Sequence, residues 1–242
     1  MRFRTFLGSL VAVVSCVLIA PVSSQAVTYT STGCAIPTQC TLQELFVIGS
    51  SIILDEGDGI TKTFNSFSLG NNTGTNPLTL SAIDVLLATS GDEVGLRFVI
   101  NGGAFLTSNQ TVDLGFHFDV LCTGCLLHDN TLQFTGGATG TGNASISEGV
   151  VDVASEDTVA TKLVFVTSQI SDLVDHKIFA FDSPLVQVNK DLNMQGGTDG
   201  TVQVSDFIQT FSQTRIPEPG SLLLIGAGLV VIGLIGRKRR NR

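Results

Sequence analysis

Apolar and polar residues alternate along much of the chain between residues 78 and 188. The clearest stretch is TVDLGFHFDV, in which apolar side chains fill every second position from Val112 to Val120. A period of two puts the apolar side chains on one face of a β-strand, so the stretch predicts a strand with one buried face. Similar patterns predict further strands near 78–87, 95–100, 131–136, 144–153, 161–166, 177–182 and 185–188.

Short clusters of Gly, Asn, Asp, Ser and Thr separate these segments. They read GNNTGTNP, SGDE, NGG, GGATGTGN and QGGTDG, a composition that favours turns. Many short strands at nearly regular spacing are typical of an antiparallel sandwich or jelly roll. We therefore expect an all-β chain with a single antiparallel, jelly-roll-like β-sandwich domain over residues 27–214. A body of this length can bury a sizeable core of its own.

Two segments depart from the strand pattern. Thr41 is followed three residues later by Glu44, which is the capping-box spacing, and this predicts a short helix over 41–47. The segment SDFIQTFSQ at 205–213 is compatible with a last strand or with a short helix, and the pattern leaves both open.

The N-terminus has the features of a secretory signal peptide. Arg2 and Arg4 precede an apolar run over 7–20, and small residues stand at the positions expected for cleavage after Ala26. A lipoprotein cleavage box ending at Cys16 is an alternative, but the apolar run continues beyond it. The sequence therefore predicts a signal peptide over 1–26 and an exported body.

The C-terminus ends in an uncharged apolar run over 221–236. As a helix, this run spans roughly 24 Å, a little less than the roughly 30 Å hydrocarbon core, so it predicts a minimal transmembrane helix. A basic tail over 237–242 follows, which the positive-inside rule places in the cytoplasm. A buried C-terminal helix of the globular domain is the alternative. The tail residues are Arg237, Lys238, Arg239, Arg240 and Arg242.

The run is preceded by Pro217, Glu218 and Pro219. The three elements in this order resemble the PEP-CTERM sorting signal of Gram-negative bacteria that make exopolysaccharide, here over residues 215–242. The resemblance implies partners in the export machinery and an exosortase that removes the tail near the proline motif. The two prolines favour an extended and accessible backbone, which suits a processing site.

The body also resembles a recurring type of PEP-CTERM protein. The features are CTLQELF near the start, VNKDLNMQGGTDGT late in the chain, and FIQTFSQT before the proline motif. These motifs are loose, and the resemblance implies no catalytic residue. It supports an exported β-domain.

Removing both ends makes the charge balance more acidic. The whole chain has a net charge of −8, but seven of its 13 basic residues lie in the signal peptide and the basic tail. Only Glu218 among the 21 acidic residues lies beyond Arg215, so the body carries a net charge near −14. A body this acidic repels phosphate backbones, which argues against a nucleic-acid partner.

Four cysteines remain in the body: Cys34, Cys40, Cys122 and Cys125. In an exported chain an even number of cysteines predicts two disulfides, for which three connectivities exist. The spacing favours local pairing of Cys34 with Cys40 and of Cys122 with Cys125. A metal site on the second pair with His128 is a weaker interpretation, because structural zinc needs four ligands.

Catalytic chemistry has little support. His117 lies on the polar face of its predicted strand, and His128 and His176 lie in loop-like contexts. The chain has no nucleophile elbow, HExxH motif or phosphate-binding loop. The acidic pairs at 55–56 and 156–157 have the appearance of exposed turns. We expect no enzyme activity, no metal site and no cofactor.

Two ligand classes stay open. The glycine-containing acidic segments at 55–59 and 190–201 offer oxygen ligands for calcium, but neither follows the EF-hand order. Glycan binding commonly uses exposed Trp or Tyr, and the chain has no Trp and only Tyr29. The sequence therefore favours an exported structural or interaction protein of the cell surface or matrix. A carbohydrate-binding module of the exopolysaccharide matrix is the alternative.

Overall fold

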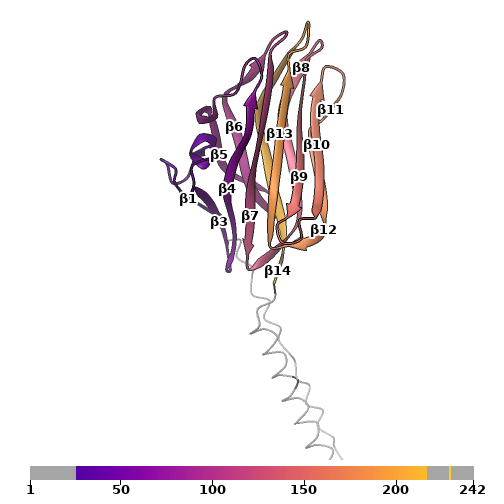
Figure 1. The fold of residues 1–242 in the computed structure, drawn as a ribbon. Coiled ribbons are helices and arrows are strands. Elements are labelled where there is room, and N and C mark those ends of the chain that lie inside the picture. The colour runs from indigo at the N-terminus through magenta and orange to yellow at the C-terminus, as the bar shows by residue number, and fades with distance from the viewer. Residues whose placement is uncertain (1–25, 217–228, 230–242) are drawn as a thin grey trace, which may run out of the picture.

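Two antiparallel sheets pack face to face in the structure, a computed structural model that describes residues 26–216 and Leu229 (Figure 1). The predicted all-β sandwich is confirmed. Apart from Ala26 and Leu229, the predicted signal peptide, proline motif, transmembrane helix and basic tail lie outside the described residues. No described helix is long and apolar enough to cross a membrane.

The larger sheet has eight strands in the order β1-β3-β4-β7-β13-β9-β10-β11. Its strands are β1 (Thr28–Thr32), β3 (Ser51–Gly57), β4 (Ile60–Thr73), β7 (Thr111–Thr123), β9 (Asn143–Asp152), β10 (Thr158–Thr167), β11 (Ser171–Asp172) and β13 (Leu185–Gln195).

The smaller sheet has six strands in the order β12-β8-β14-β6-β5-β2. Its strands are β2 (Cys40–Thr41), β5 (Ile83–Ser90), β6 (Glu93–Leu106), β8 (Cys125–Thr139), β12 (Val174–Ser183) and β14 (Thr201–Arg215). The segment at 205–213, which the pattern left open, belongs to strand β14.

The core lies between the inner faces of the two sheets. In β7 the alternate side chains from Val112 to Val120 are all buried, as the period of two predicts. Phenylalanines from both sheets meet there: Phe98 on β6 stacks on Phe207 of β14, and both contact Phe116 of β7. Most of the phenylalanine side chains in the body therefore pack between the two sheets.

Two short helical segments lie together at the β5–β2 edge of the smaller sheet (Figure 1). Helix α1 (Leu42–Leu45) has the predicted capping box, in which Thr41 Oγ1 accepts from the Glu44 backbone N–H and the Glu44 carboxylate accepts from the Thr41 backbone N–H. The helix is shorter than the predicted 41–47. A 3₁₀-helix, η1 (Leu80–Ala82), stands at the start of the predicted 78–87 strand.

The four body cysteines form two disulfides, Cys34–Cys40 and Cys122–Cys125. This is the local pairing that the spacing favours. The Cα atoms are 5.2 Å and 5.4 Å apart. The first bridge fixes the segment before α1, and the second closes the tight turn between β7 and β8.

Three sequence interpretations are corrected by the fold. His128 and His176 lie on strands β8 and β12 rather than in loops. Glu56 lies on β3 with only 12% of its side chain exposed, because it pairs with the buried Lys62. Register shifts interrupt the alternation at Glu56 and His128, whereas His176 lies in a largely exposed part of the edge strand β12, where no alternation marks a strand.

Candidate functional site

A β-bulge in β8 places a group of polar side chains on the outer face of the six-stranded sheet. The register shifts at this point against both neighbours, between Leu127 and Asp129. Leu127 and Asn130 are buried on the inner side, whereas the side chains of His128 and Asp129 remain partly exposed. A bulge adds one residue to a strand and can re-aim a side chain. Here it places two consecutive polar side chains on the same face.

The first of these, His128, pairs with Asp182 on β12. His128 Nδ1 lies 2.7 Å from Asp182 Oδ1, and the Thr214 hydroxyl donates to Asp182 Oδ2 at 2.8 Å. The hydrogen bond to Asp182 raises the pKa of His128 above its ordinary value. The same bond lowers the pKa of Asp182. Each partner thus favours the charged form of the other.

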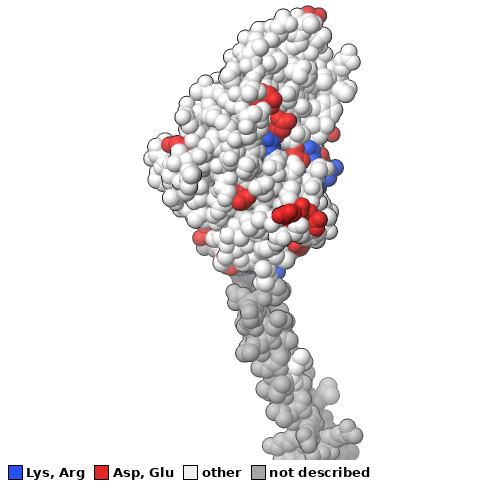
Figure 2. All heavy atoms as spheres, viewed as in Figure 1, with Lys and Arg blue, Asp and Glu red and all other residues white. Residues whose placement is uncertain are grey.

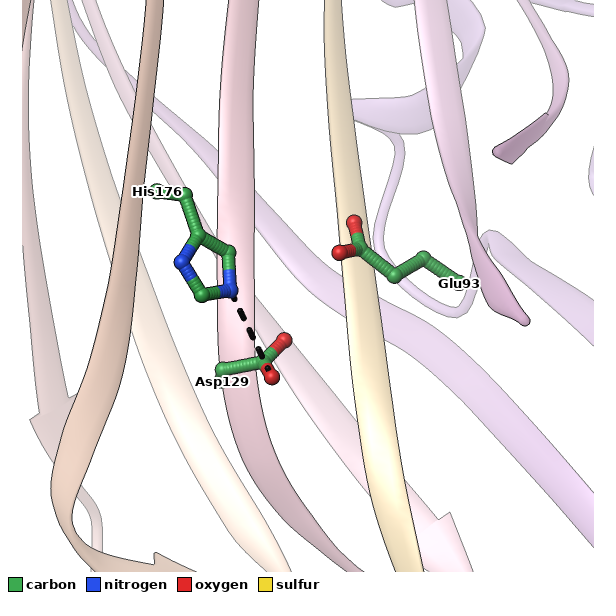
Figure 3. A group of neighbouring side chains, drawn as sticks. All are labelled: Glu93, Asp129 and His176. Carbon is green, nitrogen blue, oxygen red and sulfur yellow. Dashed lines mark ion pairs between the residues drawn. The ribbon is translucent and has the colours of Figure 1, made fainter. Parts of the chain in front are cut away.

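The second, Asp129, lies between His176 on β12 and Glu93 on β6 (Figure 3). His176 Nε2 is 3.5 Å from Asp129 Oδ2. One ligand atom from each of the three residues lies within 4.8 Å of the others. Three strands of the sheet, β6, β8 and β12, therefore bring together residues that are far apart in the sequence.

Hydroxyl groups from the sheet hold Glu93 in this position. Thr131 Oγ1 on β8 donates to Glu93 Oε1 at 3.1 Å, and the hydroxyl of Thr210 on β14 donates to Glu93 Oε2. Both threonines are nearly fully buried. The backbone N–H of Ser212 donates to Asp129 Oδ1 at 3.3 Å. The carboxylates are thus oriented before any ligand arrives, which lowers the ordering cost of binding.

We name Glu93, His128, Asp129, His176 and Asp182 the open-face cluster. Its carboxylates can accept hydrogen bonds from the hydroxyl groups of a ligand, and its imidazoles can donate to the hydroxyl oxygens. Glu93, Asp129 and His176 together offer two oxygens and one nitrogen, a donor set that suits zinc or manganese better than calcium. Within residues 26–216 this is the only group of three or more His, Cys, Asp or Glu side chains arranged in this way.

The acidic segments 55–59 and 190–201, which offer oxygen ligands for calcium, do not form a cluster of this kind. Asp58, at the turn between β3 and β4, pairs with Arg215 at 3.3 Å. Asp199 accepts from Thr141 in another turn, and Asp191 lies on β13. Neither segment gathers three His, Cys, Asp or Glu side chains. His117 lies on the outer face of the larger sheet, as its pattern indicates.

Exposed aromatic side chains are few on the described surface. Phe105 and Phe181 are 54% and 41% exposed. Tyr29 is half-buried and its hydroxyl donates to the carbonyl oxygen of Val85 at 3.1 Å. Figure 2 shows the carboxylates as separate groups on an otherwise largely uncharged face. The surface therefore offers hydrogen bonding more than ring stacking.

The comparison with protein families identifies the C-terminal segment. The model of the PEP-CTERM protein-sorting motif matches residues 215–240. The chain carries a PEP-CTERM sorting domain. The motif marks this PEP-CTERM chain as an exported protein that is sorted to the cell envelope, and it implies processing by an exosortase.

Comparisons of the remaining chain are weak. No curated protein matches the sequence. The structure is similar to the enzymatically active domain of tailspike protein 4 of bacteriophage CBA120, with a TM-score of 0.27 and 13% identity over 78% of this chain and 20% of that one. It is also similar to TmCBM61 in complex with β-1,4-galactotriose, with a TM-score of 0.28 and 10% identity over 61% of this chain and 89% of that one. A third similar structure is the xylan-binding module CBM15, with a TM-score of 0.26 and 16% identity over 67% of this chain and 97% of that one. These TM-scores are too low to establish a shared fold, and no ligand is transferred from them.

Proposed function

We propose that this protein is a non-enzymatic structural or interaction module of the cell surface or exopolysaccharide matrix, delivered there by its PEP-CTERM tail. The sorting motif at 215–240 carries the proposal. The tail follows directly on β14, which ends at Arg215 beside the disulfide-closed turn, where the N–H of Ile216 donates to the carbonyl oxygen of Gly124. Processing near Pro217–Pro219 would therefore free an almost complete sandwich.

The charge distribution supports an interaction role in an aqueous matrix. Within residues 26–216, each of the six Lys and Arg side chains pairs with a carboxylate. Three of these six, Lys62, Lys162 and Lys190, are buried in the core. The remaining carboxylates leave a strongly acidic surface, which keeps the released body soluble.

The delivery step is tested by the mass of the mature protein isolated from its host. We expect a C-terminus near Pro217–Pro219 in the surface fraction. Replacing Pro217, Glu218 and Pro219 by alanine should leave the chain uncut in the membrane fraction, whereas the exposed control Glu156→Gln should be processed normally. A wild-type chain that still ends at Arg242 would refute release into the matrix.

Carbohydrate binding is the second candidate, and the open-face cluster favours it. Oriented carboxylates and imidazoles on an exposed sheet are suited to the paired hydroxyl groups of a sugar ring. The matched test compares Asp129→Asn/His176→Gln with Asp119→Asn/His117→Gln, which makes the same replacements on the outer face of β7. Binding of matrix polysaccharide that is lost only in the first variant supports this candidate. Equal binding by both variants, or none by the wild type, argues against it.

A further inference from the structure

A buried group of charged and amide side chains crosses the core between the two sheets. On the larger sheet, Glu148 of β9 stands in register between Lys162 of β10 and Lys190 of β13. On the facing sheet, Asn130 of β8 and Gln209 of β14 point toward this row. The side chains of Glu148, Lys162 and Lys190 are at most 1% exposed, and Asn130 and Gln209 are fully buried.

The charges in this group do not balance. Two lysines share one carboxylate, since both Nζ atoms pair with Glu148. Burial lowers the pKa of Lys162 and of Lys190. Burial opposes the charged form of Glu148 as well, but its attraction to the lysines holds the pKa of this carboxyl below its ordinary value. An excess positive charge in a core is costly unless it is paired. One of the two lysines is therefore expected to be a neutral amine, which is a nucleophile.

Lys162 and Asn130 have the geometry for a reaction between them. Lys162 Nζ contacts Asn130 Oδ1, one bond away from the carbonyl carbon Cγ. A single carboxylate oxygen, Glu148 Oε1, lies 2.7 Å from Lys162 Nζ and also accepts from Asn130 Nδ2 at 2.7 Å. One carboxylate oxygen is therefore within hydrogen-bond distance of both the attacking nitrogen of Lys162 and the leaving nitrogen of Asn130. This arrangement holds both reactants and a proton carrier together in a dry site.

We propose that Lys162 and Asn130 form an intramolecular isopeptide bond that links the two sheets, with Glu148 as the general base and acid. The neutral Lys162 Nζ attacks Asn130 Cγ, so that an Nζ–Cγ bond forms and the Cγ–Nδ2 bond breaks. Glu148 accepts a proton from Nζ and transfers it to Nδ2, which leaves as ammonia. The reaction changes no oxidation state and needs no further reactant.

The neighbouring pair provides an internal comparison. Lys190 Nζ donates to Gln209 Oε1 at 2.6 Å, so this lysine also contacts an amide. However, Gln209 Nε2 has no hydrogen-bond partner within the described residues. Its nitrogen has no acid to protonate it as it leaves. Lys190 therefore serves as the charged partner of Glu148, and only Lys162 forms the isopeptide bond.

Trypsin digestion of the full-length protein after folding, reduction and alkylation tests the bond directly. Without it, cleavage after Lys162 gives separate peptides 98–162 and 163–177. With it, Lys162 is acylated and resists trypsin, which leaves one peptide, 98–177, lighter than its sequence mass by one ammonia. Further cleavage after Glu148 and Glu156 should leave 98–148 and 157–177 joined as one species. Normal cleavage at Lys162, or a link at Lys190 instead, would overturn the assignment.

Variants at Glu148 test the role of the carboxylate. Glu148→Asp keeps the charge and should retain a fraction of the linked peptide, whereas Glu148→Gln should lose at least nine-tenths of it. Folding of each variant is checked by a cooperative urea-unfolding transition. A folded Glu148→Gln protein that is fully linked would refute the proposed role. The wild-type peptide map tests the bond itself even where a variant fails to fold.

Discussion

Replacing Glu56 by Gln should destabilise the protein strongly at neutral pH, because it removes the carboxylate that forms an ion pair with the buried Lys62. The Lys62 side chain is fully buried on β4, and its Nζ contacts the Glu56 carboxylate and Gln213 Oε1. Burial lowers the pKa of Lys62, and the Glu56 carboxylate offsets part of this effect. Removing one partner of a buried ion pair costs about 3–5 kcal/mol.

The protonation equilibrium sets an independent limit on this cost. In the variant, Lys62 can avoid a buried charge by losing its proton. A lysine in the unfolded chain has a pKa of about 10.4, so removing its proton at pH 7 costs about 4.6 kcal/mol. The cost of deprotonation falls by about 1.4 kcal/mol for each unit that the pH rises. The unfolded state then binds more protons than the folded state, so the stability of the variant rises with pH. By pH 9 the penalty should fall to about 2 kcal/mol.

Urea unfolding of the non-reduced protein at pH 7, 8 and 9 measures this difference. The wild type and the exposed control Glu156→Gln define the background at each pH. Lys62→Met should cost much less than Glu56→Gln, because it leaves no charge fully buried. A penalty for Glu56→Gln that is the same at pH 7 and pH 9, or equal to that of Lys62→Met, would refute the reasoning.

Three further outcomes follow from the described contacts. Asp182→Asn should bring the pKa of His128 down toward its ordinary value, as followed by NMR titration of the imidazole, and an unchanged pKa would show that Asp182 does not set it. Replacing Cys34 and Cys40 together by Ser should cost about 2 kcal/mol in chemical unfolding, since the closed loop is short, and a loss beyond about 4 kcal/mol would contradict a loop-closure effect. Phe118→Ala should cost about 3–5 kcal/mol, because the fully buried ring contacts Phe64 and Phe67 on β4 and Phe98 on β6, and a loss below about 1 kcal/mol would mean that the core refills the space.

The buried lysines change how the composition of this body is understood. The sequence shows six basic residues against 20 acidic ones, and half of the six are in the core. The exposed cations Arg97, Lys177 and Arg215 are each paired with a carboxylate. The outer surface is therefore more uniformly acidic than the net charge alone suggests, which favours partners that bring their own cations or present neutral hydroxyl groups.

Local rules determined much of this protein from sequence alone. The period of two located most strands because alternate residues of a strand face opposite sides of a sheet, whatever the sheet's topology. The capping box at Thr41 and the disulfide-compatible spacing of the cysteines depend only on residues close in the chain. The sorting motif is likewise a contiguous segment of the sequence, so it can be recognised without knowledge of the tertiary structure.

One signal for the buried charges was present in the same alternation. Lys62, Lys162 and Lys190 each occupy the apolar phase of their strands, between buried neighbours such as Ile60 and Phe64. A lysine in that phase indicates either a strand break or an inward-pointing charge. The sequence does not say which, because the answer depends on whether a carboxylate on another strand lies opposite.

Only the tertiary structure decided which residues meet. Glu93, Asp129 and His176 come from strands β6, β8 and β12, and the last strand of the chain, β14, lies between β6 and β8 in the sheet. A bulge that the alternation hid turns His128 and Asp129 to one face. The row Lys162–Glu148–Lys190 depends on strand register, and its contact with Asn130 depends on how the two sheets face each other. Register and sheet packing are set by non-local contacts throughout the sandwich, so no short segment of the sequence contains them.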